Sequence, residues 1–187
     1  MKQLAQYKRI TADTKKLLEG QEGREVDFKL KADGIKPDDI VAFANARGGT
    51  ILIGIEEVKT EKGTQKGKVF GCVLDDKTRQ SFINIAASCR PSIDIAIRVE
   101  NFDSDKSIFR IDVPEGNDKP YCTSSGTYKI RSDGQNVAID PSLMKALILE
   151  KESEEFISRF KKASEDLQET LKRIYIALDN RMRQTEG

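Results

Sequence analysis

The chain has 187 residues, of which 34% are charged and 37% apolar, and its formal net charge is +1. This length suits one domain plus an appendage, and the balanced charge means that any nucleic-acid surface must come from local clustering of lysine and arginine. The sequence contains no histidine, which excludes Ser-His-Asp hydrolysis, Cys-His proteolysis and histidine metal sites. Catalysis would have to use carboxylates, lysine or a metal held by oxygen ligands.

Neither a targeting segment nor a disulfide pattern is recognisable in the sequence. There is no run of about 18 apolar residues and no signal-peptide pattern, so we expect a cytoplasmic protein. The three cysteines, Cys72, Cys89 and Cys122, are odd in number and scattered. This favours free thiols over a disulfide framework or a zinc site.

The first third of the chain is expected to contain a helix, a strand and a second helix. Residues 11–18 are compatible with a short helix, which the following glycines end. Residues 25–31 alternate between apolar and charged side chains, which predicts a half-buried strand with one charged face. Pro37, followed by two aspartates, is typical of the first turn of the next helix.

Residues 40–57 form the most distinctive stretch. An amphipathic helix is expected to end at Gly48–Gly49, where glycine permits left-handed or closely packed backbone. Residues 50–55 are apolar and mostly β-branched, which predicts a central strand that is covered on both faces. Gly54 inside it indicates a bulge or a close backbone approach. The strand then runs into two glutamates.

The rest of the first 140 residues is expected to complete an α+β domain: a mixed, mostly antiparallel sheet with two or three packed helices. The expected elements, in order, are a mobile hairpin tip at 59–68, a helix from an Asp75 cap to about Cys89, an antiparallel strand pair at 93–99 and 107–113, and one more strand at 127–132.

Residues 141–187 are expected to form a long amphipathic helix, capped by Asp140 and free of breakers to about Arg183. Its apolar residues advance by three or four, with one four-residue slip near Thr170. They are Phe156, Phe160, Ala163, Leu167, Leu171, Ile174 and Leu178. We favour a coiled coil or bundle that makes a homo-oligomer over folding back onto the sheet.

Four carboxylates lie near the ends of the first two predicted strands: Glu22, Asp27, Glu56 and Glu57. If these strands are neighbours, three acids converge. Oxygen ligands with open positions are what Mg²⁺ or Mn²⁺ uses to clamp a phosphodiester and activate water. With 31 acidic residues in the chain, an ordinary solvated surface is the alternative explanation.

Basic residues on strand faces or next to the glycine pair are candidates for holding a phosphate backbone. They are Lys29, Lys31, Arg47, Lys129 and Arg131. Lysine and arginine on sheet faces also serve simply as solubilising residues. Tyr121 and Tyr128 can stack on a base or belong to the core.

Three stretches together resemble a known family. They are Glu22-x4-Asp27-Phe28-Lys29, then AFANARGGTILIGIEE at 42–57, then Val69-Phe70-Gly71. They are similar to the Schlafen AlbA-type domain, whose pattern is E-x4-EFK, AFANTxGGxLLIGVDD and a following V-x-G. The resemblance covers about residues 15–140 and does not extend to the long final helix.

The resemblance implies an α/β domain related to nucleic-acid-binding proteins, and bacterial members are described as ATP-binding or transcriptional-regulator domains. Some members are metal-dependent endoribonucleases acting on tRNA or rRNA, in which three acids hold the metal. Carried over, these catalytic and metal-binding acids are Glu22, Asp27 and Glu57, with Glu56 as the neighbour if the register differs by one. Asp27 replaces the usual glutamate and Glu57 the usual aspartate, so charge is kept but reach changes by one methylene at each position.

Three functional hypotheses follow. The leading one is a cytoplasmic nucleic-acid-binding domain, with RNA as the favoured ligand, that acts as a Mg²⁺- or Mn²⁺-dependent endoribonuclease. The second is a non-catalytic DNA-binding transcriptional regulator that dimerises through its final helix. The third is an interaction scaffold whose coiled coil is the working part.

Overall fold

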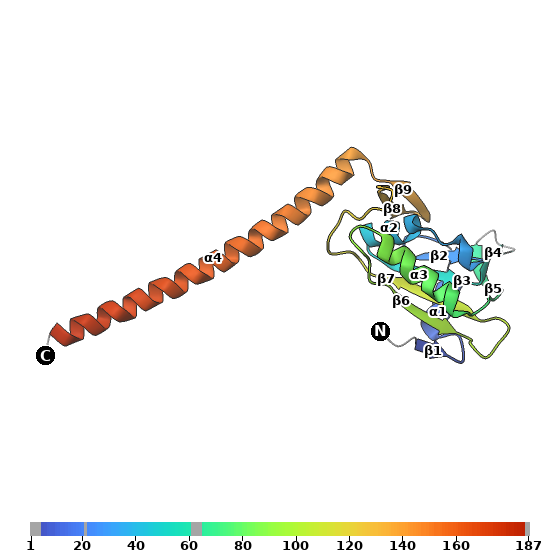
Figure 1. Cartoon of the computed structure of the whole chain (residues 1–187), viewed down its shortest axis with the longest axis horizontal. Coiled ribbons are helices and arrows are strands. Elements are labelled where there is room, and N and C mark those ends of the chain that lie inside the picture. Colours follow the sequence, from blue (N-terminus) through green and yellow to red (C-terminus); the bar gives the residue numbers. More distant parts are fainter. Residues whose placement is uncertain (1–4, 21, 61–64, 186–187) are drawn as a thin grey trace. The chain divides into compact units, whose positions relative to one another are not determined.

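The computed structural model describes residues 5–20, 22–60 and 65–185 (Figure 1). The chain divides into two compact units, Met1–Met144 and Lys145–Gly187. We call the first unit the domain. Among the described residues, no helix combines the length and the apolar character needed to cross a membrane.

The domain is built on a five-stranded mixed sheet with the order β1-β6-β7-β3-β2. The parallel pairs are β1 with β6 and β2 with β3, whereas β7 runs antiparallel to both β3 and β6. The strands are β1 (Ala5–Tyr7), β2 (Val26–Lys29), β3 (Gly49–Ile53), β6 (Ala96–Glu100) and β7 (Ile108–Val113). The predicted central strand is therefore β3, which lies between β2 and β7 and is buried from Thr50 to Ile53.

Helices cover both faces of this sheet. On one face, α2 (Pro37–Asn45) and α3 (Asp76–Ser88) pack on alternate residues of β3 and β7, such as Ile51 and Phe109. On the other face, α1 (Ala12–Glu19) packs over Phe28 and Leu52. Successive side chains of a strand point to opposite faces, so each strand supplies both cores.

Two small hairpins and one short helical turn complete the domain. The strands β4 (Ile55–Lys59) and β5 (Gln65–Val69) form one antiparallel pair, and β8 (Lys129–Ser132) and β9 (Gln135–Ala138) form the other. The 3₁₀ turn η1 (Ala32–Gly34) connects β2 to α2. Residues 61–64, the centre of the predicted mobile hairpin tip, lie outside the described residues.

Three glycines fix the path of the chain around β3. Gly48 has φ of +75°, and a Cβ there would approach Val113 O to 2.7 Å, while a side chain at Gly49 would overlap the ring of Phe43. Gly54 has φ of +88°, and a Cβ added there would lie only 2.9 Å from the backbone of Gly71. This confirms the expected helix stop and close approach, and it shows that Gly54 separates β3 from β4.

The long final helix is also confirmed. The helix α4 (Pro141–Thr185) has 45 residues (Figure 1). It begins where Asp140 Oδ1 accepts hydrogen bonds from the N–H groups of Ser142 (2.8 Å) and Leu143 (2.9 Å). No glycine or proline follows Pro141 within the helix, so nothing in the backbone chemistry ends it earlier.

The α+β class, the mixed sheet and the packed helices thus agree with the sequence analysis. One feature of β2 differs from the expectation. The strand was expected to be half-buried, with one charged face, but α2 and the β8–β9 hairpin cover that face and Asp27 is only 3% exposed. The short strands β1 and β9 were not predicted.

Candidate functional site

Asp27 is the centre of a buried ionic cluster on the α2 side of β2. Its Oδ1 lies 2.8 Å from Nη2 of Arg131 and its Oδ2 lies 2.6 Å from Nζ of Lys29. Asp39, at the start of α2, lies 3.6 Å from the same Nζ and accepts a hydrogen bond from Asn136. We call these five residues the Asp27 network. Its acids and bases are close enough to neutralise one another internally.

Lys29 is held in its charged form by this network. Partial burial opposes the charge, but contact with Asp27 and the nearby charges of Asp39 and Glu22 outweigh it, so the pKa of Lys29 lies above its usual value. The side chain is 23% exposed. Lys29 is therefore ion-paired with neighbouring carboxylates and is not an exposed, unpaired cation on the strand face.

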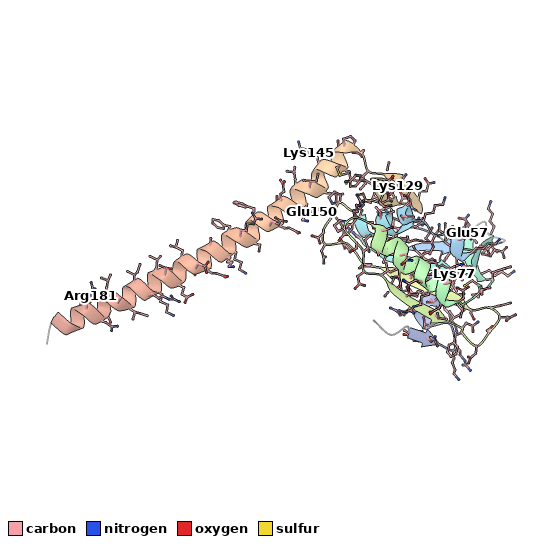
Figure 2. The ribbon with its side chains drawn as sticks, viewed as in Figure 1. Glu57, Lys77, Lys129, Lys145, Glu150 and Arg181 are labelled. Carbon is pink, nitrogen blue, oxygen red and sulfur yellow. The ribbon has the colours of Figure 1, made fainter. Side chains whose placement is uncertain are left out.

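Glu22 lies beside the network, in the turn before β2, where its Oε1 accepts a hydrogen bond from the N–H of Phe28. Partial burial raises the pKa of Glu22, the hydrogen bond from Phe28 lowers it, and the charges of Asp27 and Glu57 raise it further; the net effect is a raised pKa. Glu57 on β4 is exposed (Figure 2). The fold thus brings these three acids within electrostatic range of one another.

The acids do not form a ready metal centre, however. Both oxygens of Asp27 face cationic side chains. Among the described residues, no group of three or more histidine, cysteine, aspartate or glutamate side chains is arranged to hold a metal ion. The side chains as they stand therefore do not fit a three-carboxylate Mg²⁺ or Mn²⁺ site. Metal binding by Glu22, Asp27, Glu56 and Glu57 stays a prediction from the family resemblance.

Arg131 is a structural residue in this fold. Its side chain is 2% exposed, and it donates hydrogen bonds to Gly23 O (3.0 Å), Val26 O (3.2 Å) and Asn136 Oδ1 (2.9 Å) in addition to its contact with Asp27. Its guanidinium also lies 4.9 Å from the ring centre of Phe43. A side chain with this many internal partners has little left to offer a phosphate, so the predicted nucleic-acid contact does not fit its burial.

The other predicted ligand-binding residues are spread over the domain. Lys31 is exposed just after β2, and Lys129 is half-buried on β8 (Figure 2), where its carbonyl accepts a hydrogen bond from the Asn45 amide (2.8 Å). Arg47 is exposed at the end of α2. Tyr121 is buried in the core. Of the two explanations offered for it, stacking on a base or packing in the core, the second fits.

A second buried polar network lies on the α1 side of the sheet. Glu100 is 0% exposed and accepts hydrogen bonds from Thr11 N (2.8 Å), Thr11 Oγ1 (3.0 Å) and Thr14 Oγ1 (2.8 Å). Arg110 donates to Thr14 Oγ1 (2.9 Å) and to Asp112 (2.9 Å). We call the set Thr11, Thr14, Glu100, Arg110 and Asp112 the Glu100 network. Every carboxylate oxygen of Glu100 has a donor, as a buried carboxylate requires.

Arg110 also forms part of an open groove of about 730 Å³ where α1 ends and β2 and β3 begin. Its lining includes the backbone of the glycine pair Gly48–Gly49 and of Gly23. The lining includes two acids, Asp13 and Glu25, and four cationic side chains: Lys16, Arg24, Arg47 and Arg110. Two of these cations are paired, Arg24 with Asp133 and Arg110 with Asp112. We call this the cationic groove. It can attract an anion and offers glycine backbone for a close approach.

Of the groove's four cations, the sequence analysis named only Arg47. Lys16 and Arg24 are exposed, and Arg24 pairs with Asp133 at 2.9 Å. Arg110 is 9% exposed and occupies the sheet face opposite the main apolar core. The one sequence signal for Arg110 is its charge inside an otherwise apolar alternating strand, and that signal does not say which residues lie next to it.

The solved structures that are similar to this chain include two from bacteria. The N-terminal domain of a RecG-related protein from Nitrosomonas europaea has a TM-score of 0.48 and 20% identity, and the match covers 65% of this chain and 88% of that one. The DIP2311 protein from Corynebacterium diphtheriae has a TM-score of 0.45 and 19% identity, over 73% of this chain and 28% of that one. No curated protein matched the sequence significantly.

The family comparison is more informative. The family described as "Schlafen, AlbA_2" matches residues 22–140, well over half of the 187 residues. The matched region begins at Glu22 and includes the whole Asp27 network together with the Arg24, Arg47 and Arg110 side of the cationic groove. The chain therefore belongs to the Schlafen AlbA_2 family.

Proposed function

We propose that the domain binds the phosphate backbone of a nucleic acid in the cationic groove, with RNA as the favoured ligand and the cytoplasm as the place of action. The observation that carries the proposal is the gathering of Lys16, Arg24 and Arg47 around an open hollow with Arg110 on its wall. The family membership supports it, since the sequence resemblance relates AlbA-type domains to nucleic-acid-binding proteins.

The chemistry of the groove suits backbone contacts more than base reading. Arginine presents a planar fork of donors that matches phosphate oxygens, and glycine backbone leaves room for a chain to pass closely. Phosphate contacts position a nucleic acid without reading its sequence. We therefore expect binding that depends strongly on salt and weakly on sequence.

The test compares two charge reversals in the full chain. Arg47→Glu alters the groove, whereas Lys77→Glu makes the same charge change on α3 (Figure 2), outside the groove lining. Binding of fluorescent tRNA and of duplex DNA is followed by anisotropy over a salt series. Arg47→Glu should weaken binding roughly tenfold or more and flatten the plot of log K against log salt by about one unit.

Lys77→Glu serves as the matched control because both substituted side chains are exposed. Equal weakening by the two variants would mean that only the total charge matters and would remove the groove from the proposal. Tighter binding of duplex DNA than of tRNA would favour the DNA-binding regulator over the RNA-binding domain.

Metal-dependent endoribonuclease activity is the second candidate function. The observation in its favour is the raised pKa of Glu22, caused by partial burial and by the charges of Asp27 and Glu57, because a cation would relieve this crowding of acids. The arrangement of Asp27, with both oxygens against cationic side chains, does not fit such a site.

The same tRNA samples, incubated with and without Mn²⁺, decide on this candidate. Glu57→Ala is the informative variant because Glu57 is exposed and its loss should leave the fold intact, whereas removing Asp27 breaks a buried ion pair. Mn²⁺-dependent cleavage that Glu57→Ala abolishes would support the nuclease. Cleavage that survives the substitution would rule out Glu57 as a ligand.

A further inference from the structure

The helix α4 carries an exposed apolar stripe with a regular spacing. Its large side chains are 50–67% exposed and comprise Phe156, Phe160, Leu167, Leu171, Ile174, Leu178 and Met182. With Ala163 included, the spacing repeats every 11 residues: 156, 160 and 163, then 167, 171 and 174, then 178 and 182. The stripe is therefore continuous over about 39 Å of helix at a rise of about 1.5 Å per residue.

This repeat differs from the seven-residue repeat of an ordinary coiled coil. A strict heptad continued from Phe156 would place Thr170, Ala177 and Arg181 in the seam. The 11-residue repeat places Leu171, Leu178 and Met182 there instead. It corresponds to about 3.67 residues per turn, slightly more than the α-helix, and so favours nearly straight helices with a weak right-handed supercoil.

We propose that this stripe pairs with the same stripe of a second copy of the chain, in parallel orientation. If each large side chain loses roughly 100 Å² of exposed surface, the pair buries about 1,400 Å² in total, within the range of stable dimers. The described part of the domain offers no comparable apolar stripe of its own. Its exposed large apolar side chains in the described residues are Tyr7, Leu30, Phe70, Val73 and Val137, of which only Phe70 and Val73 lie in the same segment, the loop between β5 and α3.

The charges at the edges of the stripe set the orientation. Asp179 follows Leu178 and Arg181 precedes Met182, so these two charges lie on opposite edges. Opposite edges face each other in a parallel pair, which brings Asp179 of one copy near Arg181 of the other. In an antiparallel pair equal edges meet, and Arg159 then faces Arg181. Like charges at such positions disfavour that arrangement.

The first experiment measures the mass of the full-length chain in solution over a concentration series. We expect twice the mass of one chain. Leu171→Glu places a charge in the stripe and should weaken the dimer about 100-fold. Ile176→Glu is the matched control, since Ile176 is similarly exposed (49% against 56%) but lies outside the stripe. It should leave the dimer intact.

A monomeric wild-type chain, or a dimer that persists in Leu171→Glu, would overturn the proposal. A mass of three or four copies would replace the pair by a bundle. Docking of the stripe on the chain's own domain would give a monomer in which Leu171→Glu changes the protease sensitivity of α4 but not the mass.

The second experiment tests orientation by oxidation. In a parallel pair Leu178→Cys forms a disulfide with its own copy in the partner chain, whereas Ile176→Cys does not. The native cysteines are the same in all samples, and Cys89 and Cys122 are buried. A disulfide that forms only in mixtures of Phe160→Cys and Leu178→Cys chains would show an antiparallel pair and overturn the orientation.

Discussion

The two faces of the central sheet each contain a buried carboxylate, and they handle it differently. Glu100, on the α1 face, receives three hydrogen bonds from Thr11 and Thr14 and is closed to solvent. Asp27, on the α2 face, is paired with two cations, and the half-buried Glu22 beside it has a raised pKa. On the α1 face both oxygens of Glu100 accept hydrogen bonds, whereas the α2 face contains an ion-paired acid, Asp27, next to Glu22, whose pKa is raised.

The difference shows how to separate structural from functional charge in this domain. A buried carboxylate whose oxygens all have donors mainly specifies packing. A carboxylate whose pKa is raised by burial and by other acids is a better candidate for binding a cation or a proton. By this criterion Glu22 is more open to a ligand than Asp27, whose oxygens contact Lys29 and Arg131.

The largest expected effect comes from breaking the Asp27 network. Arg131→Met removes the buried cation that contacts Asp27 and spans β8 and β2. Asp27 would then keep only Lys29 as an ionic partner. The substitution should therefore lower the free energy of unfolding by about 3 kcal/mol, the lower end for a broken buried ion pair. Urea denaturation at pH 7 measures it.

The control for Arg131→Met is Arg24→Met, which breaks an exposed ion pair with Asp133 whose side chains are 73% and 78% exposed. A loss within about 0.5 kcal/mol is expected there. Adding Asp27→Asn to Arg131→Met should recover part of the loss, since it removes the unpaired charge. Similar losses for Arg131→Met and Arg24→Met would mean that the network is not a buried one.

The local part of this fold could be predicted from the sequence. The helix before the glycine pair, the glycine stop and the buried strand β3 follow from periodicity and from the backbone needs of Gly48, and the long α4 follows from its uninterrupted stripe. The strand β1 was missed because three residues carry too little pattern, and β9 because its residues mix polar and apolar types.

The environment of the candidate site could not be predicted in the same way. The alternation in β2 places Asp27 on a charged face, but only contacts distant in sequence decide whether that face meets water. Arg131 comes from β8, about a hundred residues later, and covers it. The cationic groove has the same origin, since Lys16, Arg24 and Arg110 come from separate elements that only the sheet order brings together.

A smaller loss is expected from Glu100→Gln. The substitution keeps the shape of the side chain but turns one hydrogen-bond acceptor into a donor facing Thr11 or Thr14, which are donors to it now. The mismatch should cost about 1.5–3 kcal/mol, measured by urea denaturation. Tight tRNA binding should persist under conditions where the variant is folded. A variant as stable as the wild type would show that the Glu100 network is less complete than its geometry indicates.

The smallest effect, and the most informative one about the acids, is expected from Glu22→Gln. Because the pKa of Glu22 in the folded protein is raised above its usual 4.5, the folded state keeps a proton that the unfolded chain has already lost. The folded state then binds more protons, so this contribution to stability falls as pH rises from about 4.5 through the folded pKa. Glutamine does not titrate and can still accept the hydrogen bond from Phe28. The stability of Glu22→Gln relative to wild type should therefore increase between acid and neutral pH, by less than the two losses above, as followed by urea denaturation at several pH values. A stability difference that stays constant with pH would mean that the pKa of Glu22 is not raised in the folded protein, and the contrast between the two faces of the sheet would be lost.

Glu57→Gln should lower the pKa of Glu22 in an NMR titration because it removes one of the charges that raise it.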